Sequence, residues 1–234
     1  MIDHGQLLEN RIVKKEKNSL ITTETNIIIR LFNKIVKKYR FYLNFLFIVF
    51  IFKCSSVPEF HYYFLNYDMP RKENTNPKYP YILGIEEFDS DEIYNNDSIV
   101  YRDSPYEIKH YIYKKWAGNP RNLISEKALE HFIASGLFKV VRFYPNFHRI
   151  DYLLRGNIKS FEEWDKQDGW YSKFSLEIEF INVHNDSILF VLRTDKVEKA
   201  VSKSVIDVVK SMSVCVKETF DEIISKIDNS LSEL

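Results

Sequence analysis

The second half of the chain is patterned by apolar residues that alternate with polar ones. This alternation is cleanest over residues 152–159 and 170–180, where charged or polar side chains separate the apolar ones. A period of two residues predicts strands with one buried face. Residues 184–187, His-Asn-Asp-Ser, are typical of a turn and lead into an apolar stretch at 188–193. We therefore expect the last two of these stretches to form a hairpin.

Shorter strand signals occur before this region. They are runs rich in β-branched and aromatic residues, bounded by Pro, Gly, Asn or Asp, and they cover residues 61–65, 81–85, 98–102, 107–113 and 138–144. Such runs fit the pleated, half-buried surface of a sheet. We expect them to join the later hairpin in one sheet.

Two segments have a helical period instead. Asn119 and Pro120 are typical of a helix start, and Gly136 stands where a left-handed stop is expected. Near the C-terminus apolar residues recur about every 3.7 residues, which predicts one amphipathic helix over about 202–231. That helix would be roughly 45 Å long, and the sheet is the most economical cover for its apolar face.

This order of elements predicts an α/β fold. We expect a single domain with a mixed, largely antiparallel sheet packed against two principal helices, one of them the long C-terminal amphipathic helix. The predicted organisation is a leader at 1–53, a lipid-anchor region and linker at 54–80, and the α/β domain at 81–234.

The leader contains an apolar run, FYLNFLFIVFIF, at residues 41–52, directly after the basic cluster 37–40. Twelve residues are too few to cross a bilayer as a helix, which takes about 20. A basic flank followed by an apolar stretch of this length is typical of a secretory signal. A buried core helix and an uncleaved membrane anchor stay open as alternatives.

Composition excludes some classes of protein. With 45% hydrophobic and 15% aromatic residues among 234, the chain can bury a core, so disorder over most of its length is excluded. Its 33 basic and 33 acidic residues balance overall. Residues 1–40 carry a net charge of +5, whereas residues 55–234 carry −6. No whole-protein basic field therefore favours nucleic acid as a partner.

The two cysteines are expected to differ in role. Cys54 follows the apolar run and resembles the lipidated Cys of bacterial lipoproteins, although Lys53 departs from the small residue usual before it. We predict that Cys54 carries the lipid anchor, with an unmodified Cys as the alternative. Cys215 lies within the apolar pattern of the last helix and is expected to be buried.

Catalytic candidates are few. Glu162 and Glu163 are adjacent carboxylates, but neighbours on a strand point to opposite faces and cannot flank one bond, so we expect a solvated hairpin end. His131 is expected to pack at the surface boundary of the first helix. Arg102 and Trp116 are expected to support the fold or a partner contact. We predict no catalytic residue, no metal and no cofactor.

Two stretches resemble a known family. They are SIVYRDSPYEI at residues 98–108 and YKKWA at 113–117, and together they give an Ile-Val-x-Arg strand, a turn, an aromatic strand and a Trp-Ala step into a helix. This order is similar to that of the ABC-type transport auxiliary lipoprotein family, which includes PqiC-like lipoproteins. Residues 151–156, the later hairpin and the closing helix also resemble the second half of that family. The resemblance covers residues 60–231.

The resemblance implies an outer-membrane lipoprotein that faces the periplasm and serves a lipid transport system. Such a system has an inner-membrane ABC transporter and an MCE-domain protein that bridges the envelope. The accessory protein would dock the bridging protein, either as a single chain or as a homo-oligomer, without catalysis of its own. Tyr106, Tyr113 and Trp116 are the expected partner contacts if they lie on the surface, because Tyr and Trp dominate interface hot spots.

Two other classes of function stay open at this point. A periplasmic lipid- or ligand-binding lipoprotein or enzyme would need a deep pocket with convergent polar groups. A nucleic-acid-binding module would use the basic arm 1–40.

Overall fold

The computed structural model describes residues 25, 27–40, 42, 58–69, 76–145 and 149–233. The chain forms two compact units, Met1–Val57 and Pro58–Leu234. In the first unit, residues 27–40 form an exposed helix. The predicted signal segment 41–52 lies outside the described residues except for Tyr42, and so does Cys54. Among the described residues, no helix combines the length and apolar character needed to cross a bilayer.

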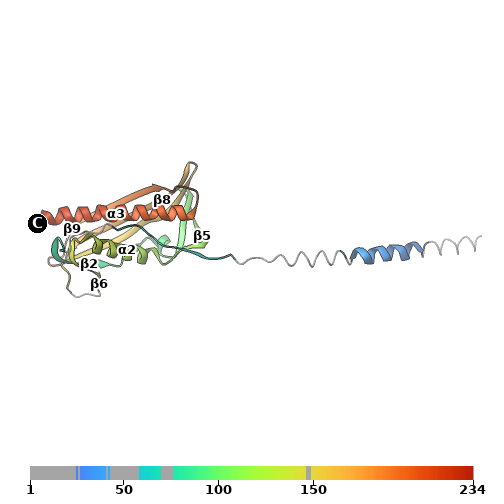
Figure 1. Ribbon diagram of the computed structural model, residues 1–234, viewed down its shortest axis with the longest axis horizontal. Coiled ribbons are helices and arrows are strands. Elements are labelled where there is room, and N and C mark those ends of the chain that lie inside the picture. The colour runs from blue at the N-terminus through green and yellow to red at the C-terminus, as the bar shows by residue number, and fades with distance from the viewer. Residues whose placement is uncertain are drawn as a thin grey trace, which may run out of the picture. The chain divides into compact units, whose positions relative to one another are not determined.

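The described part of the second unit contains one mixed sheet of nine strands (Figure 1). The strands are β1 (His61–Tyr63), β2 (Tyr79–Glu86), β3 (Asp89–Ser90), β4 (Ser98–Ser104), β5 (Glu107–Trp116), β6 (Phe138–Tyr144), β7 (Tyr152–Lys166), β8 (Gly169–Asn182) and β9 (Ser187–Lys199). The helices are the short 3-10 helix η1 (Glu92–Tyr94), α2 (Pro120–Ser135) and α3 (Val205–Ser232). The predicted α/β class, the mixed sheet and the two principal helices are confirmed.

Strand β7 organises the sheet. On one edge it pairs antiparallel with β8 along nearly its whole length, and β8 pairs antiparallel with β9. On its other edge it pairs in parallel with β2, then β3, then β4 at successive positions. The strand order β1-β5-β4-β7-β2-β6 completes the sheet. The longest ladders are therefore the antiparallel ones predicted from alternation, while the parallel pairs join segments far apart in sequence.

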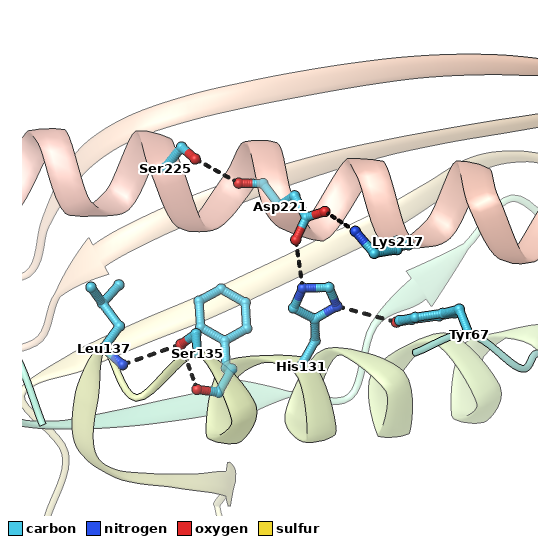
Figure 2. A network of polar contacts seen from close by, with 8 residues as sticks. Tyr67, His131, Ser135, Leu137, Lys217, Asp221 and Ser225 are labelled. Carbon is cyan, nitrogen blue, oxygen red and sulfur yellow. Dashed lines mark hydrogen bonds and ion pairs between the residues drawn. The ribbon is translucent and has the colours of Figure 1, made fainter. Parts of the chain in front are cut away.

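Helix α2 begins and ends at capping residues, and helix α3 begins at one. The Asn119 side chain accepts a hydrogen bond from the Arg121 backbone N–H at 3.0 Å, and Gly136 ends α2 with φ of 60°. The Ser204 side chain caps the start of α3. Helix α3 contacts β8 and β9, and α2 contacts β2 and β6, with the two helices side by side over the sheet (Figure 2).

The core lies between the sheet and these helices. The apolar residues whose spacing predicted α3 are all buried, namely Val205, Val209, Met212, Val216, Phe220, Ile223, Ile227 and Leu231. Cys215 is also buried, as predicted. The sheet contributes fully buried side chains to the same cluster, among them Leu154 and Phe174. This packing places the structural residues inside and leaves the sheet edges, the hairpin turns and the outer sheet face for binding.

Candidate functional site

Exposed aromatic side chains gather along β1 and the strand that pairs with it. Phe60, Tyr62 and Phe64 alternate along one extended segment and are 48%, 59% and 66% exposed. Strand β1 pairs in parallel with the end of β5, and the Tyr113 ring lies 5.5 Å from the Phe60 ring. We call these four residues the aromatic edge. They give this border of the sheet an apolar surface that a bilayer or a protein partner could cover.

The three predicted partner contacts are not brought together. Tyr106 is 96% exposed in the turn between β4 and β5, where its backbone N–H donates to the Ser104 hydroxyl. Tyr113 is exposed on the aromatic edge, seven residues further, which is about 23 Å along a strand. The two tyrosines therefore meet the surface requirement, but at opposite ends of β5.

The position of Trp116 contradicts the expected partner contact at the surface. It is the last residue of β5, directly before the loop that enters α2, and it is 2% exposed. Its ring packs 4.6 Å from the Phe161 ring inside the core. A surface contact through this side chain is therefore wrong, and the residue supports the fold.

The segment that follows the predicted anchor is fastened to the domain. The Ala117 backbone N–H donates to the Tyr63 carbonyl at 2.9 Å, and the Asn66 backbone N–H donates to the Ser213 hydroxyl of α3 at 3.1 Å. Leu65 between them is buried. Residues 58–69 thus belong to the compact unit, although the sequence suggested a linker over 54–80.

His131 joins this segment to both helices (Figure 2). Its Nδ1 lies 3.3 Å from the Tyr67 hydroxyl, and its Nε2 lies 2.9 Å from Asp221 of α3. Asp221 also accepts a hydrogen bond from Lys217 at 2.6 Å. Burial lowers the pKa of His131, and the neighbouring Asp221 opposes that shift. The expected surface-boundary position is wrong, because His131 is fully buried with both ring nitrogens close to polar partners.

The adjacent Glu162 and Glu163 are also placed differently from the prediction. They point to opposite faces of β7, as expected, but both are buried, at 2% and 1% exposure. The solvated hairpin end is wrong because β7 continues to Lys166, and the turn comes only after it. A register irregularity between Ile158 and Ser160 reverses which residues face the helices.

Glu162 is held by four donors. Its oxygens accept hydrogen bonds from Arg102 at 2.6 Å, from Tyr94 at 2.8 Å, from Trp164 at 2.8 Å and from the Ser160 hydroxyl at 3.1 Å. Burial raises the pKa of Glu162, but these hydrogen bonds more than offset it, so the net pKa is lowered. The carboxylate is ionised and paired at neutral pH. Arg102 therefore supports the fold, as one of its two expected roles.

Glu163 has the opposite environment. One carboxyl oxygen accepts a hydrogen bond from the Tyr111 hydroxyl at 2.9 Å. Its other oxygen, and one oxygen of Asp165 two residues further on the same strand face, are buried with no hydrogen-bond partner among the described residues. Burial, and then Asp165, raise the pKa of Glu163 to about 8. Burial also raises the pKa of Asp165. At neutral pH the two carboxyl groups are therefore expected to hold a proton between them.

Sequence reasoning missed this pair because it considered only the adjacent glutamates. Carboxylates at positions i and i+2 of a strand share a face, and the sequence Glu163-Trp164-Asp165 contains that spacing. The partner Tyr111 comes from β5, through a pairing that the local pattern does not reveal.

Two hollows of the described surface lie beside the segment 64–69 and helix α2. One of about 650 Å³ is lined by Tyr67, Asp68 and Met69 together with residues of α2. Another of about 440 Å³ lies beside Phe64, Leu65 and the start of α2. Neither is lined by Glu163 or His131. Within the described ranges, no three His, Cys, Asp or Glu side chains are grouped to hold a metal ion.

Comparison with known proteins shows the fold. No family model and no curated protein matches the sequence. A crystal structure of a Xanthomonas campestris protein described by the family model DUF330 matches with a TM-score of 0.65 and 15% identity, over 74% of this chain and 97% of that one. An uncharacterized protein matches with a TM-score of 0.58 and 16% identity, over 72% and 99%. The described domain thus has a DUF330-like fold.

Proposed function

We propose that this chain is a non-catalytic accessory lipoprotein of an ABC/MCE-type lipid transport system, docking the envelope-bridging component at the outer membrane. The observation that carries the proposal is the fold likeness to the DUF330 structure, which extends over 97% of that chain. PqiC-like lipoproteins share that fold class. The stretches that resemble the auxiliary family, residues 98–108 and 113–117, form the β4–β5 hairpin.

The position of the aromatic edge supports a membrane-anchored arrangement. Cys54 precedes Phe60 by six residues, and six extended residues span at most about 21 Å. A lipid on Cys54 would therefore keep the aromatic edge close to the membrane surface. Tyr106 lies at the other end of β5, about 23 Å along the strand from Tyr113, and would face a partner that arrives from the periplasm.

The charge of the domain supports docking to a protein. Residues 55–234 carry a net charge of −6, which opposes adhesion to anionic lipid headgroups. Tyr106 is an exposed aromatic side chain at the tip of the β4–β5 hairpin, and exposed aromatic residues often anchor protein interfaces. We assign the docking contact to the tip of this hairpin.

The test is co-purification of a tagged, membrane-anchored full chain from detergent extracts. We expect MCE and ABC components to be recovered with the parent chain and to be reduced with Tyr106→Ala. Val183→Ala is the matched control, because Val183 is 40% exposed and directly follows β8, at the end of the β7–β8 ladder opposite to the end beside the β4–β5 turn. Failure to recover any transport component would overturn the proposal. So would a hydrolase activity that a point mutation abolishes.

A further inference from the structure

Strand β9 is a long edge strand. It has 13 residues and pairs with β8 on one side, while no strand in the described parts of the chain pairs with its other side. Alternate residues of β9 therefore direct backbone N–H and C=O groups away from the sheet without a strand partner. Such an edge is a template for pairing with another strand.

The outer face of β9 has a symmetric sequence. Its alternate residues Val191, Arg193, Asp195 and Val197 point away from α3, since Thr194 and Lys196 between them point toward it. The two valines are 57% and 55% exposed, and the side chains of Arg193 and Asp195 are 56% and 52% exposed. Read in either direction from Thr194, the face presents a charged residue and then a valine.

This symmetry suits pairing with a second copy. In an antiparallel pair centred on Thr194, Arg193 of one copy stands opposite Asp195 of the other, and Val191 stands opposite Val197. Each contact occurs twice, as a two-fold interface requires. Opposite charges and apolar side chains across antiparallel strands are stabilising pairs. We propose that β9 joins a second copy of this chain in this register, which makes one continuous sheet through the dimer.

The same residues disfavour neighbouring registers. A centre at residue 193 would place the two Arg193 side chains opposite each other, and a centre at residue 195 would do the same for the two Asp195 side chains. Like charges directly opposite are destabilising, so the charges specify the register. The dimer is independent of the proposed transport role, since the docking tip at Tyr106 belongs to another strand pair.

Charge exchange tests this interface. In the full chain in detergent, Arg193→Asp places two acidic pairs across the interface, and Asp195→Arg places two basic pairs there. Each single variant should dimerise about tenfold more weakly than the parent, by sedimentation equilibrium. The double variant restores both opposite-charge pairs and should recover the parent affinity.

Mixing the two single variants is the decisive measurement. A heterodimer of the Arg193→Asp and Asp195→Arg chains again has opposite charges at both positions, so the mixture should dimerise while each variant alone does so weakly. Equal melting temperatures of the parent chain and the charge variants would show that the substitutions leave the fold intact. The proposal would be overturned if the parent chain were monomeric at micromolar concentration. It would also be overturned if the parent and all the charge variants dimerised with the same affinity. Capture of a different protein's strand by monomeric parent chains would assign the edge to that partner and would also overturn it.

Discussion

Replacing Glu163 by Gln is expected to stabilise the domain in alkaline solution and to change it little near pH 5. The Glu163 carboxyl is 1% exposed, and one of its oxygens faces no donor among the described residues. A Gln side chain has the same shape as the protonated acid. Its oxygen can accept from Tyr111, and its amide can donate to the Asp165 oxygen that lacks a partner.

The direction of the pKa shift determines whether the free energy of unfolding rises or falls with pH. The pKa of Glu163 is raised to about 8 in the folded protein from 4.5. Below the lower value the carboxyl is protonated in both the folded and unfolded states. As the pH rises toward 8, the unfolded chain loses the proton that the folded chain retains, so the free energy of unfolding falls. One pKa unit corresponds to about 1.4 kcal/mol, so the loss is on the order of 4 kcal/mol by pH 9.

Urea denaturation at pH 5, 7 and 9 measures this effect. We expect the parent to lose stability across this range and the Glu163→Gln variant to lose much less, because the variant has no proton to release at this position. The advantage of the variant at pH 9 should be about 2 to 4 kcal/mol. If the parent and the variant showed parallel pH dependence, or if the variant were weaker at pH 9, the shared-proton assignment would be refuted.

Glu162→Gln is the matched control. The pKa of Glu162 is lowered on balance, so its stabilising contribution is present above its usual pKa and is lost as the pH falls through the folded value. Replacing this carboxylate weakens charge-assisted hydrogen bonds from Arg102, Tyr94 and Trp164. The control variant should therefore be less stable than the parent at pH 7, by about 2 to 3 kcal/mol. Adjacent residues of one strand would thus respond to the same substitution with opposite signs.

Three further predictions concern the anchor and the core. Cys54→Ser should move the protein from the membrane to the soluble fraction, and a variant that fractionates with membranes as the parent does would contradict lipidation there. Val216→Asp should unfold the domain, because it buries an unpaired charge, whereas Val214→Asp on the exposed side of the same helix should melt near the parent temperature. Gly156→Ala places a Cβ 2.7 Å from the Phe88 ring and should lower the free energy of unfolding by about 1 to 3 kcal/mol. Gly118→Ala is the control: its Cβ would lie 3.7 Å from the nearest side chain, so thermal melting should show a far smaller loss.

The elements that depend on local pattern could be predicted from the sequence. Alternation identified the β7–β8–β9 region, and the capping residue Asn119 and the stop at Gly136 bounded α2 closely. The apolar period of α3 also gave its buried face correctly. These features depend on residues within a few positions of one another, so a single sequence contains the information.

The parts that failed depend on pairing between distant strands. Burial of Glu162 and Glu163 requires β4 to pair in parallel with β7 and β5 to lie on the far side of β4, and neither pairing leaves a mark in the local pattern. The bulge after Ile158 adds to this, because it exchanges the two faces within one strand. Trp116 was misplaced for a related reason, since the core ring it packs against lies on β7.

The contacts that fix residues 63–67 to the domain limit how far a lipid-anchored domain could lie from the membrane. Tyr63, Leu65 and Tyr67 are each fixed to the sheet or the helices, with His131 joining Tyr67 to α3 through Asp221. Strand β1 is paired with β5 from His61 onward, so under the proposed lipidation the chain between the anchor at Cys54 and the domain is at most seven residues long. Seven extended residues span at most about 25 Å, which keeps the domain near the membrane surface. That geometry favours a partner that itself extends to the membrane, which is the arrangement an envelope-bridging protein provides.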